Sequence, residues 1–171
     1  MEVKAYHRVN FYDTDAMGVV HHANYIRWFE IGRVEFLRTL GITLGDLMDA
    51  GYVFPLTDVS AKFVASAHFD DELVVVTRPT ALTKVKMAFD YEVRRATDDR
   101  LLVRGHTQNV FTSRETGNIA KLPAKFYEKL QLALAGEDAP RDLTLFIAAG
   151  DNAADTLGTR APAATDISAM L

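Results

Sequence analysis

The alternation of apolar and polar residues predicts a strand at the start of the chain and a long helix after it. Residues 3–12 alternate, so successive side chains fall on opposite faces of a strand. From Tyr25 to Leu40, apolar residues recur at helical spacing, which predicts roughly four turns with one buried stripe. The two elements are joined by a turn, in the run Y-D-T-D-A-M-G-V-V-H-H-A-N-Y from Tyr12 to Tyr25.

The rest of the chain predicts an antiparallel meander followed by a short helix. Four runs have strand character, namely residues 59–66, 72–82, 84–95 and 101–113. Pro79 predicts an edge, a bulge or an early end in the second run. Residues 125–134 predict a closing helix after Pro123. One strand, one long helix and four antiparallel strands form an α+β layout in which the sheet wraps the helix.

Composition favours one domain followed by a tail. The chain has 171 residues, of which 49% are hydrophobic, and no cysteine, which excludes disulfides and cysteine-ligated zinc. Residues 1–135 hold 17 basic and 17 acidic residues, whereas residues 136–171 hold 2 and 6. This balance offers no basic stripe for nucleic acid. We therefore expect a domain over 1–135 and a flexible, acidic, alanine-rich tail over 136–171, with a docking patch at 143–149. No signal peptide or long apolar run is visible, which predicts a cytoplasmic protein without an integral membrane segment.

The turn brings one acidic side chain, Asp15, to the start of the long helix. The first N–H groups of a helix lack intrahelical acceptors and carry partial positive charge, so they can polarise a carbonyl oxygen as well as hold an anion. A carboxylate and an oxyanion site would therefore lie side by side. The alternative is that Asp15 only accepts hydrogen bonds from the turn or caps the helix, and the residues alone favour this alternative. Asp13 could instead serve as the turn-forming carboxylate, which leaves Asp15 free.

Two sequence patterns about fifty residues apart support the chemical interpretation. The first consists of Asp15, Gly18, Val19, Val20, His21, His22, Asn24 and Tyr25. The second consists of Phe63, Ala67, Phe69, Asp70 and Asp71, in the run F-V-A-S-A-H-F-D-D. Together they resemble the hotdog-fold acyl-CoA thioesterases of the 4-hydroxybenzoyl-CoA thioesterase family, over residues 3–134. The resemblance implies a hotdog fold, an antiparallel sheet wrapped around a long central helix.

The resemblance also implies that Asp15 and His22 are catalytic in hydrolysis of an acyl-CoA thioester. Asp15 would act as a general base toward water or as a nucleophile that forms a mixed anhydride. The backbone N–H of His22 would bind the thioester oxygen, a contact worth about 3 kcal/mol in the transition state. Its imidazole has a second candidate role, which is to orient water or the leaving thiol.

Five further residues are candidate substrate contacts. Gly18 would allow close approach or unusual torsions in the turn, although simple loop flexibility also explains it. Asn24 and Tyr25 would line the pocket, but Tyr25 equally begins the buried stripe of the helix. Lys84 and Lys86 correspond to basic residues that meet the phosphates of coenzyme A in relatives, with a solvated strand face as the alternative. Five further aromatics are most simply core, namely Trp28, Phe29, Phe36, Phe63 and Phe89.

The sequence also bears on several other functions. Adjacent histidines such as His21 and His22 seldom point into one site, and no partner follows at helical spacing, so we expect no metal and no bound cofactor. A G-x-S-x-G elbow is absent from the sequence. A non-catalytic acyl-CoA binding module and a hotdog enoyl-thioester hydratase remain alternatives, although the hydratase signature of Asp and His is not seen. The resemblance implies a homodimer or homotetramer with its site at the subunit boundary.

Overall fold

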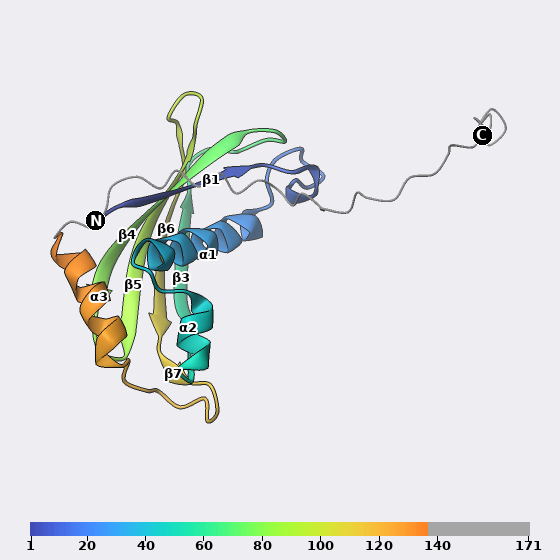
Figure 1. The fold of residues 1–171 in the computed structure, drawn as a ribbon. Helices are drawn as coiled ribbons and strands as arrows, with labels where there is room; N and C mark the ends of the chain where they lie inside the picture. The colour runs from blue at the N-terminus through green and yellow to red at the C-terminus, as the bar shows by residue number, and fades with distance from the viewer. Residues whose placement is uncertain (137–171) are drawn as a thin grey trace, which may run out of the picture.

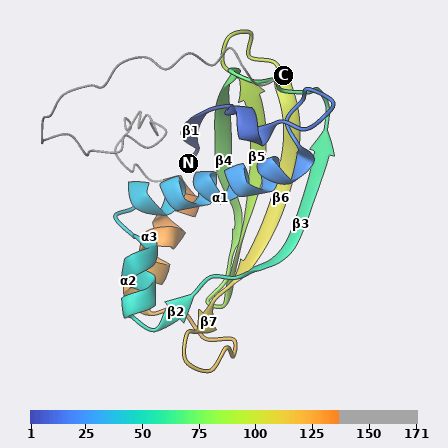
Figure 2. The same ribbon diagram turned by 90° about the vertical axis from the view of Figure 1, so that its right-hand side faces the viewer.

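In the computed structural model, which describes residues 1–136, a curved antiparallel sheet wraps around one long helix (Figure 1). The helix, α1 (His22–Thr39), crosses the concave face of the sheet (Figure 2). The sheet has five strands in the order β1-β4-β5-β6-β3, with the bounds β1 Val3–Arg8, β3 Leu56–Phe63, β4 Glu72–Leu82, β5 Lys86–Arg95 and β6 Leu101–Val110. The predicted α+β layout is therefore confirmed. The predicted acidic tail lies outside the described residues, apart from Gly136.

Smaller elements complete the fold at the two ends of the sheet. They are the 3-10 turn η1 (Phe11–Asp13), helix α2 (Leu44–Asp49), strands β2 (Tyr52–Val53) and β7 (Thr112–Ser113), which pair with each other, and helix α3 (Ala124–Ala135). Helix α2 begins at a capping box in which Thr43 and Asp46 exchange hydrogen bonds. Neither α2 nor β2 follows from the apolar pattern alone.

The predicted strands are correct in type but shifted at several boundaries. Strand β1 ends at Arg8 rather than at residue 12, because the chain turns into η1. Strand β3 begins three residues before the predicted 59–66 segment. The bulge anticipated at Pro79 is present, since the register with β5 shifts between Pro79 and Ala81. In β5, the apolar side chains of the alternating pattern face α1 and form the core.

Helix α1 approaches the sheet closely because a glycine of the sheet faces the helix and another glycine lies on the helix side that faces the sheet. A Cβ atom added to Gly105 in β6 would lie 2.2 Å from Cζ of Phe29, whose ring stacks on Tyr91 with centroids 4.6 Å apart. A Cβ atom on Gly32 of α1 would lie 2.2 Å from Oγ1 of Thr77 in β4. These contacts fix the height of α1 above the sheet, and with it the position of the helix start.

The sheet has two edge strands, β1 and β3, and the edge at β3 is exposed. Strand β3 pairs with β6 on one side, and its other side has no strand partner within residues 1–136. Every side chain of β3 except that of Ala61 is exposed, including the apolar Leu56, Val59 and Phe63. Such a row of unpaired backbone groups with apolar neighbours is a template for pairing with another strand.

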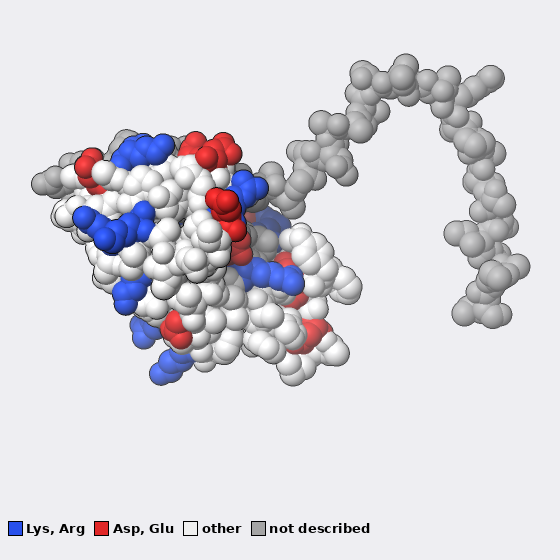
Figure 3. Space-filling view, turned by 90° about the horizontal axis from the view of Figure 1, so that it is seen from below, with Lys and Arg blue, Asp and Glu red and all other residues white. Residues whose placement is uncertain are grey.

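Two surface properties of the described residues bear on partners. Basic and acidic side chains are interspersed on the face seen from below, so that face has no continuous basic stripe (Figure 3). Among residues 1–136, no helix combines the length and the apolar character needed to cross a bilayer.

Replacing Gly105 by alanine is expected to destabilise the fold by about 1–3 kcal/mol, because the new methyl group overlaps the enclosed ring of Phe29. Urea unfolding followed by circular dichroism measures the change. Gly45→Ala is the matched control, because its Cβ atom would meet only Oγ1 of Thr43 at an ordinary 3.5 Å. Equal stability of the two variants would contradict the close-packing account.

Candidate active site

The loop between β1 and α1 is organised around the buried side chain of Asp13. Its Oδ2 atom accepts a hydrogen bond from the backbone N–H of Asn10 at 2.8 Å and lies 3.4 Å from Nε2 of His7 on β1. The backbone oxygen of Asp13 accepts hydrogen bonds from the N–H of His21 at 2.9 Å and from the side-chain amide of Asn24 at 2.8 Å. One residue thus ties the end of β1 to the start of α1. This is the structural role anticipated for the first acid of the D-x-D motif.

Asp15 follows in a tight, partly exposed turn. Its Oδ1 atom accepts a hydrogen bond from the backbone N–H of Met17 at 2.8 Å, and its backbone oxygen accepts one from the N–H of Gly18 at 2.9 Å. Gly18 has a φ of 71°, a left-handed conformation that glycine adopts without strain. No hydrogen bond from the described residues reaches the second carboxylate oxygen, Oδ2. The turn therefore holds Asp15 by one oxygen and leaves the other available.

The first N–H groups of α1 are satisfied with one exception. His21 N–H donates to Asp13, the Ala23 N–H donates to Nδ1 of His21 at 3.3 Å, and the Asn24 N–H donates to the backbone oxygen of His21. No acceptor among residues 1–136 takes the N–H of His22. An unpaired N–H at a helix start, beside a carboxylate, is the arrangement that binds an oxygen on which negative charge develops.

Asp15 and His22 line the same open pocket of about 330 Å³. Helix α1 contributes His22 and Tyr25, and the segment after β3 contributes residues 64–66 to the opposite wall. Phe63, which the sequence places in the core, is half exposed and lines this pocket with its ring edge-on to Tyr25 and to His22. The correction follows from the edge position of β3, which no helix covers.

The side chains of Asn24 and Tyr25 are both buried. The amide of Asn24 is engaged by Asp13, and its Oδ1 atom accepts a hydrogen bond from Arg27. Tyr25 lines the pocket with its ring, while its hydroxyl bonds to the backbone of Ala67. Burial raises the pKa of Tyr25, so it stays protonated at neutral pH. Both residues hold the loop against the helix.

The segment after β3 is held in place by an arginine, a structural role that the sequence patterns do not predict. Arg95 of β5 donates hydrogen bonds to Asp71 at 3.2 Å and to the backbone oxygen of Ser66 at 3.1 Å. Asp71 also accepts a hydrogen bond from the backbone N–H of His68. Ser66 lines the pocket, so this network supports the wall opposite His22. The final Asp of the second sequence pattern therefore has a structural partner.

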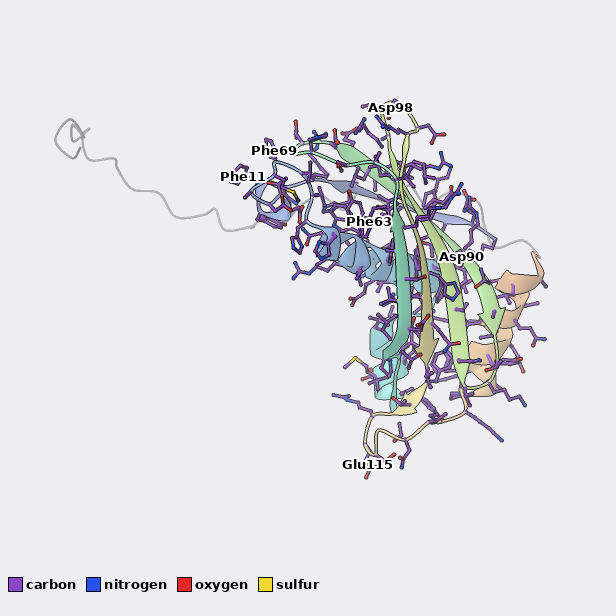
Figure 4. All side chains as sticks on the ribbon, turned by 180° about the vertical axis from the view of Figure 1, so that it is seen from behind. Phe11, Phe63, Phe69, Asp90, Asp98 and Glu115 are labelled. Carbon is purple, nitrogen blue, oxygen red and sulfur yellow. The ribbon has the colours of Figure 1, made fainter. Side chains whose placement is uncertain are left out.

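Exposed aromatic side chains surround this end of the molecule. Phe11 and Phe69 contact each other edge-on, with centroids 6.0 Å apart, and Tyr12 and Met17 lie exposed in the same loop. Figure 4 shows Phe11, Phe63 and Phe69 at one end, away from Glu115 at the other. Clustered exposed apolar surface of this kind is typical of a binding region.

Lys84 and Lys86 are not brought to Asp15 within one subunit. They lie exposed at the turn between β4 and β5, whereas the Asp15 loop lies near Glu72 at the other end of β4. Ten residue steps along a strand span roughly 33 Å. Any contact between these lysines and a substrate held at Asp15 would therefore come from a neighbouring subunit or from a long ligand.

Comparison with known proteins relates this chain to thioesterases by sequence and by structure. A family profile described as the thioesterase-like superfamily matches residues 9–130. A putative esterase of Aquifex aeolicus is 32% identical over 124 residues, which is 72% of this chain and 94% of that protein. The acyl-CoA thioesterase YbgC of Haemophilus influenzae is 35% identical over 91 residues, or 53% of this chain and 67% of that protein. The crystal structure of a 1,4-dihydroxy-2-naphthoyl-CoA thioesterase from Synechocystis has a TM-score of 0.72 at 26% identity, covering 82% of this chain and all of that one.

The partly buried contact between His7 and Asp13 predicts a pH dependence of stability. Burial lowers the pKa of His7, and the hydrogen bond and charge of Asp13 oppose this effect without cancelling it. The unfolded chain therefore binds a proton near pH 6.5 that the folded chain binds only at lower pH. The free energy of unfolding should fall as the pH is lowered through this range, and His7→Gln should weaken that dependence.

Urea unfolding at about pH 7.5 and about pH 5.5 measures this effect. His106→Gln is the control, because His106 is partly exposed on the outer face of the sheet, beside Asp90. If wild type and His7→Gln lose equal stability on acidification, His7 is not the group responsible.

Proposed function

The chain belongs to the thioesterase-like superfamily and has the hotdog fold of its structural relatives, and we propose on this basis that it hydrolyses acyl-CoA thioesters to a free acid and coenzyme A. The relatives named as acyl-CoA thioesterases support this substrate class. The observation that carries the proposal is that the Asp15 carboxylate and the His22 N–H, which has no acceptor among residues 1–136, belong to residues that line the same pocket.

The His22 N–H acts on the thioester carbonyl in this proposal. As the carbonyl carbon becomes tetrahedral, negative charge gathers on its oxygen, and a fixed donor at the helix start stabilises that charge without reorganisation. The neighbouring N–H groups are already bonded, so the oxygen has one preferred position. A single donor of this kind contributes about 3 kcal/mol to lowering the barrier.

Asp15 supplies the second half of the chemistry by one of two routes. As a base, it takes a proton from water, hydroxide adds to the carbonyl carbon, and the departing thiolate of coenzyme A then receives the proton. As a nucleophile, its carboxylate adds to the carbonyl carbon and displaces the thiolate, leaving an anhydride that water cleaves. Both routes require an ionised carboxylate with one accessible oxygen. The Met17 N–H donates to Oδ1 of Asp15, so Oδ2 is the accessible oxygen.

The remaining candidate residues take supporting roles. Gly18 keeps the turn compact beside the pocket, and the Tyr25 ring forms part of its floor. We assign Asn24 to holding the loop rather than to touching substrate, because its amide is engaged by Asp13. The exposed imidazole of His22 lines the pocket and is suited to orient water or the leaving thiol.

We also infer that two copies join along β3, with the active site at their boundary. The free edge of β3 is exposed along its length and carries Leu56, Val59 and Phe63. Pairing would cover this apolar row and would enclose the pocket at Phe63, which is open in one subunit. It would also bring basic residues such as Lys84 and Lys86 toward the other subunit, where they could meet the phosphates of coenzyme A. Assembly into a tetramer, a cytoplasmic location and independence from any cofactor stay predictions from the sequence.

A non-catalytic acyl-CoA binding module is the second candidate function. It would need the pocket but not the carboxylate of Asp15. The presence of the Asp15 carboxylate and the unpaired N–H of His22 at the same pocket favours the enzyme, because binding alone requires no carboxylate beside an uncharged thioester. An enoyl-thioester hydratase lacks a comparable supporting observation.

Asp15→Asn is expected to lower kcat for acyl-CoA hydrolysis by about 10²–10⁴-fold, because an amide can neither take a proton nor attack the carbonyl. Free thiol release across a panel of acyl-CoAs measures activity, and calorimetry on the variant measures substrate binding, which should persist. Asp49→Asn, at the end of α2, is the control and should keep full activity. Undiminished turnover by Asp15→Asn would refute the assignment, and binding without turnover by wild type would favour the binding module.

Placing lysine at both Leu56 and Val59 is expected to convert a dimer to a monomer and to lower activity more than 10-fold, because charges on the free edge of β3 oppose pairing. Light scattering after size-exclusion chromatography measures the mass. Leu132→Lys makes the same kind of change at an exposed position of α3 and should leave the mass unaltered. A dimer that survives the double substitution would exclude β3 as the interface.

A further inference from the structure

A second cavity lies beside α1, away from the Asp15 pocket of the same subunit. It has a volume of about 130 Å³ and is lined by residues of α1, of α2 and of the segment at β2. Figure 2 shows how these three elements lie relative to one another. Its lining is mainly apolar and includes Leu37, Leu47, Met48 and Phe54. A dry cavity of comparable size, about 150 Å³, accommodates one benzene molecule in another protein. This cavity can therefore receive a group of roughly six carbon atoms.

Arg33 is the unusual residue of this lining. Its side chain projects from α1 into the lining, and the residue is only 9% exposed. Within residues 1–136, its side chain donates a hydrogen bond to the hydroxyl of Tyr91. No carboxylate within residues 1–136 forms an ion pair with it. The guanidinium has five N–H donors and no anionic partner among these residues, so it can donate to a further acceptor at the cavity.

The surroundings of Arg33 do not supply the missing anion. Glu30 lies one helical turn earlier and lines the same cavity, but it is exposed and is not paired with Arg33. The charge of Glu30 is in contact with water and is screened. Tyr91 stays neutral at ordinary pH, because burial raises its pKa to about 12. A carboxylate entering the cavity would satisfy the guanidinium with two parallel hydrogen bonds.

The position of the cavity connects it to the neighbouring active site in the proposed dimer. Along α1 of one subunit, Arg33 is eleven residues from His22, or about 16 Å. If β3 of one copy pairs with β3 of a second copy about a two-fold axis, the two strands are antiparallel. The Leu56 end of one strand then lies opposite the Phe63 end of the other. Phe54, just before β3, lines this cavity, and Phe63 lines the Asp15 pocket. The cavity of one subunit then adjoins the thioester site of the other.

We propose that this cavity holds the far end of the acyl group and that Arg33 binds a carboxylate there. The preferred substrates would be coenzyme A thioesters of short dicarboxylic acids, because the cavity volume limits the part of the chain beyond the thioester to roughly six carbons. This inference rests on the proposed thioesterase function and on pairing through β3. It differs from both in naming the chemistry at the end of the acyl chain.

The test compares two substrates of equal chain length, adipoyl-CoA and hexanoyl-CoA, by free thiol release with the full-length protein. The terminal carboxylate should raise kcat/KM by about 10-fold or more, as expected for hydrogen bonds to a buried charged group. Arg33→Met should lower kcat/KM for adipoyl-CoA by about 10–100-fold and leave hexanoyl-CoA hydrolysis unchanged or improved. Arg33→Lys keeps the charge without the planar fork and should give an intermediate preference.

Arg104→Met is the matched control, because Arg104 is largely exposed on β6 and does not line this cavity. It should leave the preference for adipoyl-CoA intact. Circular dichroism and mass measurements establish that each variant is folded and assembled. Should Arg33→Met fail to fold, wild type and Arg33→Lys still report the preference and its dependence on the guanidinium.

The outcomes separate this inference from the proposed function. Equal hydrolysis of both substrates by wild type would overturn the assignment of Arg33 and leave the thioesterase proposal standing. An equal loss for both substrates in Arg33→Met would do the same, since it would indicate a structural role for the arginine. Hydrolysis of neither substrate, nor of any other acyl-CoA, would instead refute the thioesterase function.

Discussion

The depth at which α1 settles into the curved sheet is the constraint on which the rest of the structure depends. Gly105 lets the Phe29 ring lie on the sheet, and Gly32 lets the helix backbone meet Thr77. A larger side chain at either glycine would lift the helix, and interiors packed at crystal-like density do not absorb such a shift locally. Because the helix is rigid, its height also fixes its first turn. The N–H of His22 is thus positioned by contacts several turns away.

The loop before α1 divides two carboxylates between two tasks. Asp13 is enclosed, and its hydrogen bonds with Asn10, His21 and Asn24 hold the loop to the helix. Asp15 lies in a turn of its own with one oxygen held. A buried carboxylate is stabilised only when its acceptors are filled, so it cannot also serve a substrate, whereas a partly exposed one can. The spacing of the D-x-D motif is what allows adjacent turns to give the two acids such different surroundings.

The sequence predicts those features that depend on local patterns. Period-two alternation identifies β5, and the glycine-bearing turn with its helix start identifies the surroundings of Asp15. Long-range features are not predicted, because the pattern does not reveal which strand lies at an edge. The sequence alone therefore assigns Phe63 to the core, although β3 leaves it half exposed beside the pocket. The distance between Lys84 and Asp15 and the buried position of Arg33 likewise follow only from strand order and helix packing.

Assembly and chemistry share the same strand in this fold. Phe63 belongs both to the exposed edge of β3 and to the wall of the Asp15 pocket. A second subunit that covers this edge would therefore also exclude water from the pocket. Removing water from that site would strengthen the interaction of the His22 N–H with a developing oxyanion, since the local dielectric constant falls. At the other end of β3, Phe54 belongs to the cavity that Arg33 lines. An antiparallel pairing of the two edges would therefore join each thioester site to an acyl cavity of the opposite subunit, so that neither subunit is complete by itself.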